Sequence, residues 1–113
     1  MNRTAIEAIV GQYEKHGWVL RRVLLSAAAL ESIKPGDDHF IENAQLVLSD
    51  LDAAWFSRTS PEGRETWELR SLGSTPYAID AFLDEALTSV ERDEILQNTE
   101  DRMLEAAPHL RDN

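Results

Sequence analysis

The chain has 113 residues, of which 42% are hydrophobic and 28% charged, a composition typical of one globular domain. It contains no cysteine, which excludes disulfide scaffolds, thiolate metal sites and thiol catalysis. The net charge of −10 gives a surface that repels phosphate backbones and anionic lipids, so neither nucleic acid nor a membrane is an expected partner.

The first expected element is a helix over residues 5–16. Thr4 and Glu7 have the spacing of an N-terminal capping box, and Gly17 stands where a left-handed residue commonly ends a helix. Apolar residues recur here at helical spacing: Ile6, Ile9, Val10 and Tyr13. The segment does not resemble an export signal, so a cytoplasmic location is expected.

Residues 18–25 are rich in β-branched and aromatic side chains and predict a strand, although the leucine spacing also permits a helix. A short helix over 26–33 is expected next. It must end before the loop 35–38, because a proline and a glycine follow there. Residues 45–48 are expected to form another short strand.

The strongest supersecondary signal is a β-hairpin. Residues 53–58 and 64–72 have strand character, and they flank 60–63, where proline and glycine occupy the positions that a type I turn prefers. A four-residue loop predicts that Thr59 faces Arg64.

That register sorts the hairpin side chains into two faces. Trp55 faces Glu68 and stands among polar side chains, while the predicted core face carries Ala54, Phe56, Trp67 and Leu69. A loop one residue longer would place Trp55 opposite Trp67, and this alternative stays open.

Two helices are expected to close the chain. The first covers 76–87, with Thr75 as its N-cap and Pro76 at its first position. Its apolar residues follow helical spacing: Ile79, Phe82, Leu83, Ala86 and Leu87.

The second of these helices is expected over 88–107. Thr88 and Glu91 form another capping box, and Pro108 ends the helix. Residues 108–113 are expected to be a frayed tail.

This order of elements predicts a single α+β domain over residues 1–113. Its sheet would be antiparallel, with three to four strands in the order α-β-(β)-β-β-α-α. The N-terminal helix and the two C-terminal helices would pack on one face of that sheet.

Two acidic segments are candidates for chemistry. Asp37, Asp38 and His39 form a dense cluster of possible metal ligands or acid/base groups in a glycine-containing loop. Asp50 and Asp52 are spaced as a pair of carboxylates that could perform acid/base catalysis, but capping of the turn that enters the hairpin explains both residues and is the favoured interpretation.

The hairpin supplies the candidate interaction residues. Trp55 is expected on a partly exposed sheet face together with Arg58, Glu68 and Arg70. Tryptophan and arginine on such a face are typical anchors of protein interfaces. The competing interpretation is that another element covers this face and that Trp55 belongs to a second core.

These features predict a small cytosolic protein-binding or regulatory module that acts as a homodimer through the hairpin face or an acidic helical surface. Residues 61–113 carry a net charge of −8, against −2 for residues 1–60. The alternatives are a small metal-dependent hydrolase using Asp and His groups of residues 37–52, and a small-molecule binding domain. No cofactor is expected.

Overall fold

The computed structural model describes residues 3–32, 44–73 and 76–110. In chain order the elements are α1 (Arg3–Lys15), β1 (Val19–Leu25), α2 (Ala27–Ser32), β2 (Gln45–Leu48), β3 (Ala53–Thr59), β4 (Glu65–Ser71), β5 (Ala78–Leu83) and α3 (Ser89–Leu110). The five strands form one sheet in the order β2-β1-β3-β4-β5. The α+β class and the N-terminal helix predicted from the sequence are confirmed.

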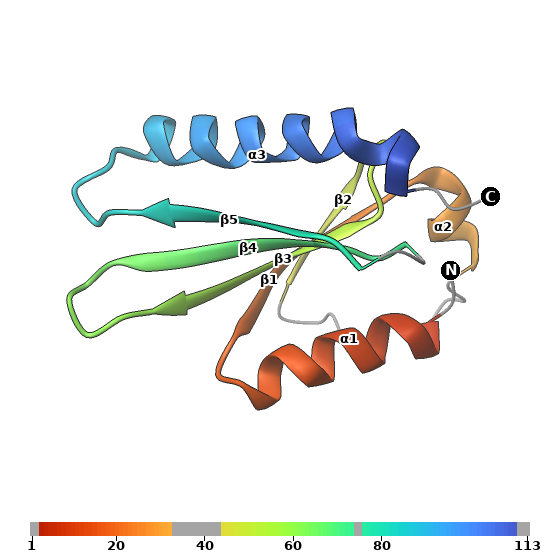
Figure 1. The fold of residues 1–113 in the computed structure, drawn as a ribbon, viewed down its shortest axis with the longest axis horizontal. Coiled ribbons are helices and arrows are strands. Elements are labelled where there is room, and N and C mark those ends of the chain that lie inside the picture. Colours follow the sequence, from red (N-terminus) through yellow and green to blue (C-terminus); the bar gives the residue numbers. More distant parts are fainter. Residues whose placement is uncertain (1–2, 33–43, 74–75, 111–113) are drawn as a thin grey trace.

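Helices cover both faces of this sheet. Figure 1 shows α3 along one side and α1 along the other. The expectation that all helices share one face is therefore wrong. The physical reason lies in β3, where residues 53–57 are all buried, because a central strand with apolar side chains on both faces needs cover on both.

The sheet is mixed and larger than expected. β1 and β2 run parallel, joined through α2, while the other neighbouring strands pair antiparallel. A purely antiparallel sheet of three to four strands was predicted, and the fifth strand comes from residues expected to be helical.

That fifth strand, β5, replaces the helix predicted over 76–87. Ile79, Ala81 and Leu83 are buried and alternate with exposed residues, which is the two-residue period of a strand. The same apolar residues also fit a helical stripe, and pairing with β4 decides between the two patterns. The expected N-cap, Thr75, lies outside the described residues.

The N-terminal half follows its local signals closely. α1 ends at Lys15, and Gly17 has a φ of 87°, the left-handed conformation predicted for it. β1, α2 and β2 fall within or on the predicted ranges. A bulge in β1 between Leu20 and Arg22 leaves Arg21 as an extra residue, whose guanidinium donates a 2.7 Å hydrogen bond to Ser57 Oγ.

The β3–β4 hairpin forms, but its register differs from both registers considered above. Ser60 pairs with Arg64 through a 2.8 Å backbone hydrogen bond, so Thr59 faces Glu65. The cause is Gly63, whose φ of 80° makes it the extra, left-handed residue that follows the turn. A one-residue shift exchanges the faces of a strand, and Trp55 now opposes Leu69.

The C-terminal helix begins where its capping box predicts. Thr88 N–H donates to Glu91 Oε1 at 2.9 Å, and Glu91 N–H donates to Thr88 Oγ1 at 3.1 Å. The helix continues to Leu110, beyond the end predicted before Pro108. No helix within the described ranges is both long and apolar enough to cross a membrane.

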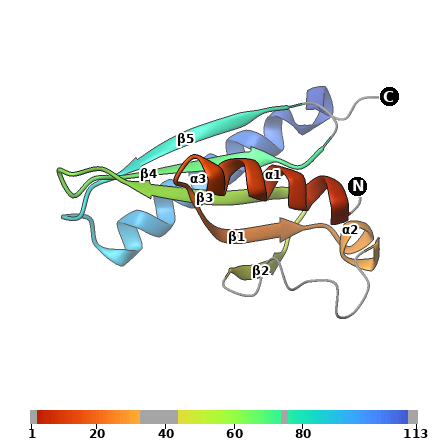
Figure 2. The same ribbon diagram turned by 90° about the horizontal axis from the view of Figure 1, so that it is seen from below.

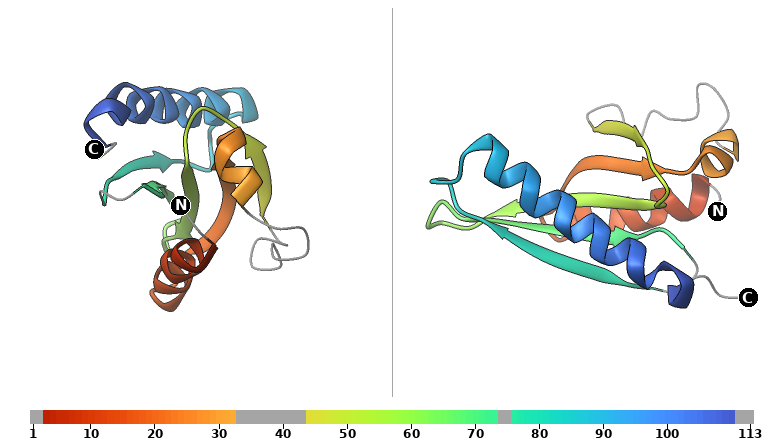
Figure 3. Two further views of the ribbon diagram at one scale, coloured as in Figure 1. Left: turned by 90° about the vertical axis from the view of Figure 1, so that its right-hand side faces the viewer. Right: turned by 90° about the horizontal axis from the view of Figure 1, so that it is seen from above.

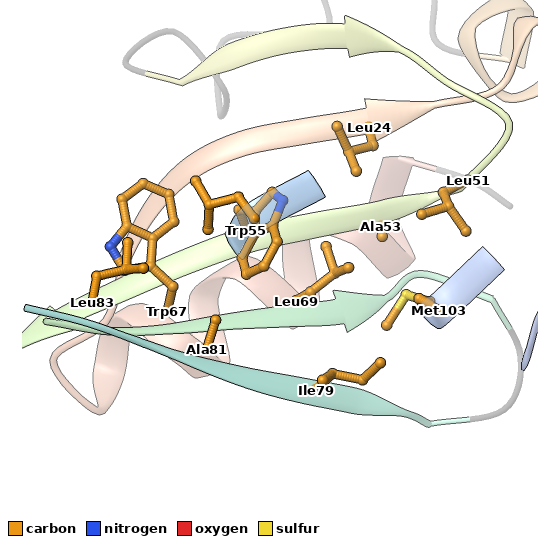
Figure 4. Close-up of a cluster of buried hydrophobic side chains, with 11 residues drawn as sticks. Leu24, Leu51, Ala53, Trp55, Trp67, Leu69, Ile79, Ala81, Leu83 and Met103 are labelled. Carbon is orange, nitrogen blue, oxygen red and sulfur yellow. The ribbon is translucent and has the colours of Figure 1, made fainter. Parts of the chain in front are cut away.

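Two hydrophobic cores lie on opposite sides of the sheet. The core beneath α3 contains Trp55, Trp67 and Met103 among other residues, and Figure 4 shows these side chains gathered over β3, β4 and β5. The core beneath α1 contains Ile6, Val10 and Phe56 among others. β3 contributes alternate residues to each core and so links the two.

Candidate interaction face

Among the described residues, no helix covers one half of the sheet on the α1 side. α1 packs against β1 and its residues reach the core beside β3, whereas β5 extends away from it (Figure 2). We call the outward residues of β4 and β5 on this side the open sheet face. It consists of Thr66, Glu68, Arg70, Ala78, Asp80 and Phe82, none of which is fully buried.

A hydrogen-bonded acidic cluster lies where this face meets α1. The Tyr13 hydroxyl donates to a Glu68 carboxylate oxygen, and Glu68 lies opposite Asp80 on the neighbouring strand. Burial raises the pKa of Glu68, and its hydrogen bond with Asp80 adds to this effect. Burial, together with the bond to Glu68, also raises the pKa of Tyr13. A proton held on Glu68 relieves the repulsion between the two carboxylates.

Aromatic rings fix Tyr13 in this position. Its ring stacks on Phe56 with centroids 4.0 Å apart, and it meets Trp18 edge-on at 5.9 Å. The guanidinium of Arg58 lies 4.6 Å above the Trp18 ring, a cation–π contact at the rim of the face. Arg70 donates to the backbone carbonyl of Ser71. The face therefore presents cations, carboxylates and aromatic groups held by their neighbours.

The structure separates the four interaction residues predicted from the sequence. Arg58, Glu68 and Arg70 lie on the α1 side. Trp55 points to the other side of the sheet and is 0% exposed (Figure 4). Its Nε1–H donates a hydrogen bond to Glu100 Oε2 at 2.8 Å. Its ring meets that of Trp67 edge-on at 5.9 Å. The interpretation of Trp55 as part of a second core is the one that the structure supports.

Phe82 is the exposed aromatic residue that the sequence argument missed. It is 72% exposed near the C-terminal end of β5, beside Thr66 on β4. The helix predicted over 76–87 placed Phe82 in an apolar stripe and hid its alternation with Ala81 and Leu83. A strand pattern tested against the same residues would have placed Asp80 and Phe82 together on the outward face.

Of the acidic candidates for chemistry, the structure describes Asp50 and Asp52. Asp52 accepts a 2.8 Å hydrogen bond from the Ser26 N–H, next to the start of α2, which is a structural use of that carboxylate. Asp50 is exposed on the connection between β2 and β3. Asp37, Asp38 and His39 lie outside the described residues. Over the described ranges, no three His, Asp or Glu side chains are grouped so that they could hold a metal ion.

Comparison with known proteins gives no family for this chain. No family model, no curated protein and no solved structure matches it. No relative assigns a function, so we infer one from the residues of the open sheet face.

Proposed function

We propose that this protein is a small protein-binding module that forms a homodimer through the open sheet face. The observation that supports this proposal is Phe82, a large aromatic side chain 72% exposed near the end of a regular strand. Aromatic and arginine side chains on one face are the types that dominate protein interfaces. Here Phe82 shares its face with Arg70 and, at the rim, Arg58.

The charges on this face favour a second copy of the chain as the partner. In a two-fold interface the same patch meets itself, so each patch must carry groups of both signs. Arg58 and Arg70 can then meet Glu68 and Asp80 of the other copy. A face that was only acidic would repel its own copy, given a chain net charge of −10.

The edge of the sheet points to the same partner. β5 is an outermost strand, paired on one side with β4. Its sequence contains no lysine and no proline, the residues that commonly protect an edge against pairing with another chain. Because Phe82 belongs to this unprotected strand, a second copy that packs on the open sheet face also covers part of the edge.

Light scattering at several protein concentrations, near neutral pH and physiological salt, tests this proposal. The wild-type chain is expected at twice the mass of one chain, and Phe82→Glu at the mass of one chain. Val90→Glu is the matched control. Val90 is an apolar residue 63% exposed at the start of α3, so this substitution introduces the same charge away from the open sheet face. A wild-type monomer at every concentration would refute the homodimer.

A further inference from the structure

A groove runs along the opposite side of the molecule, between α3 and the strands β1 and β2. It consists of two adjoining hollows of about 310 Å³ each, and Val47, Gln97 and Glu100 line both of them. Figure 3 shows α3 crossing this face of the sheet, with β1 and β2 beside it. Phe82 and the open sheet face lie on the other side of the sheet and take no part in it.

Carboxylates dominate the polar lining of this groove. Among the described residues that line it, Arg22 is the one cation, at the same end as Asp93. The other end holds Asp50 and Asp101, with Glu100 between the two ends. The groove therefore has a field that attracts positively charged groups, most strongly at its Asp50 end.

The groove also has apolar surface and a fixed carboxylate. Leu51 and Leu104 line the acidic end, and Val47 lies in the middle. Leu104 is 40% exposed. Glu100 accepts the hydrogen bond from buried Trp55, which holds its carboxylate in place before any ligand arrives. Such preorganisation reduces the entropy lost on binding.

The length of the groove sets the size of its ligand. From Asp93 to Leu104 an α-helix rises about 16 Å. An extended peptide covers that distance with about five residues. A ligand that carries both cationic and apolar side chains would match the carboxylates and the apolar residues of the lining.

We propose that this groove binds a short, extended, basic segment of a partner protein. Lysine or arginine side chains of that segment contact Asp50 and Asp101, and an apolar side chain packs on Leu104. The proposal rests on the function proposed above only in assigning protein binding to this chain. It does not require the homodimer.

The test is a fluorescence anisotropy titration with the full chain and a labelled, amidated peptide of sequence Lys-Leu-Arg-Val-Lys. The wild-type protein is expected to bind it saturably, and more weakly as salt is raised. Removing two carboxylates by Asp50→Asn with Asp101→Asn is expected to weaken binding about tenfold, since exposed ion pairs contribute modestly each. Leu104→Ser is expected to weaken it without changing any charge.

The matched control is Glu14→Gln with Glu62→Gln, which changes the net charge by the same amount on α1 and in the hairpin loop. Its affinity should stay close to wild type. Equal weakening by both double variants would overturn the proposal, because overall charge alone would then explain binding. Equally tight binding of a peptide with glutamate at each basic position, or no wild-type binding, would also overturn it.

A second readout separates this groove from the homodimer. Phe82→Glu should keep the wild-type affinity for the basic peptide, whatever its mass by light scattering. Conversely, the groove variants should keep the wild-type mass. Loss of peptide binding in Phe82→Glu would place the peptide on the open sheet face and overturn the assignment to the groove.

Discussion

Trp55 is buried in the core beneath α3, although it was predicted on a partly exposed face. Its indole is fully buried and still needs a partner for its N–H, since a buried polar group without a hydrogen bond costs free energy. Glu100 on α3 accepts that bond, 45 residues further along the chain. A single sequence cannot reveal this pairing, because it depends on where α3 crosses the sheet.

Glu68 allows a prediction about pH at the same scale. A carboxyl group whose pKa is raised by folding stabilises the protein below its unfolded pKa, and this contribution is lost as pH rises through its folded pKa. Glu68→Gln removes the charge and keeps an oxygen that can accept the Tyr13 hydrogen bond. We expect its Tm to exceed that of wild type by about 2–4 °C near neutral pH.

Thermal unfolding followed by circular dichroism from acidic to neutral pH checks this prediction. The advantage of Glu68→Gln should disappear below the unfolded pKa of glutamate, about 4.3. The variant is compared with wild type at each pH, because Glu65 changes the stability of both proteins with pH in the opposite direction to Glu68. The Arg92 guanidinium lowers the pKa of Glu65, so its contribution is lost as pH falls. Glu62→Gln, an exposed change of equal charge, should show no such dependence on pH.

At the scale of elements, the sequence predicts a helix end correctly where one or two neighbouring residues determine the backbone conformation. Gly17 ends α1 and Thr88 begins α3 because a left-handed glycine and a capping box act within a few residues. β5 was mistaken for a helix because its apolar residues fit both periods. The neighbour that decides, β4, becomes adjacent only after folding.

The hairpin register shows the same limit within a single turn. Pro61 and Gly63 were recognised as turn residues, but the left-handed Gly63 adds one residue and lets Ser60 pair with Arg64. That single step moved Trp55 to the side of α3. It also left Glu68 and Arg70 on the open sheet face and Arg58 at its rim, so the sequence indicated these three residues but not Phe82.

The capping box of α3 can be tested directly. In Thr88→Ala the Glu91 N–H loses its side-chain acceptor at the start of a 22-residue helix. The free energy of unfolding is expected to fall by about 1 kcal/mol. Ser89→Ala is the control, because Ser89 is the adjacent exposed residue and the same hydroxyl is removed without loss of the cap. Urea denaturation measures both variants, and equal stability of the two would contradict the role given to Thr88.

At the scale of the molecule, the sequence of β3 already indicates a sheet that is covered on both faces. Ala53, Ala54, Trp55 and Phe56 form a continuous apolar run, which is typical of a strand buried on both faces. The prediction instead assumed that residues of this strand alternate between a buried and an exposed face. Since both cores are built on β3, the three layers should depend on one another for stability.

Substitutions in each core test that dependence. Ile6 belongs to α1 and Met103 to α3; each points into the core on its own side of the sheet and is only 1% exposed. Truncation of either to alanine is expected to cost about 2–5 kcal/mol, through lost burial and the cavity that remains. Val90→Ala, at an exposed site, is expected to change stability by less than about 0.5 kcal/mol.

The informative measurement is whether two probes report one transition. In a Trp18→Phe background, which removes the tryptophan on the α1 side, tryptophan fluorescence follows Trp55 and Trp67 on the α3 side, whereas far-ultraviolet circular dichroism follows all the helices. If β3 joins the layers, Ile6→Ala should lower the denaturation midpoint equally by both probes, although Ile6 does not belong to the tryptophan core. A fluorescence midpoint that stayed at the wild-type value would mean that α1 and its core unfold separately from the sheet.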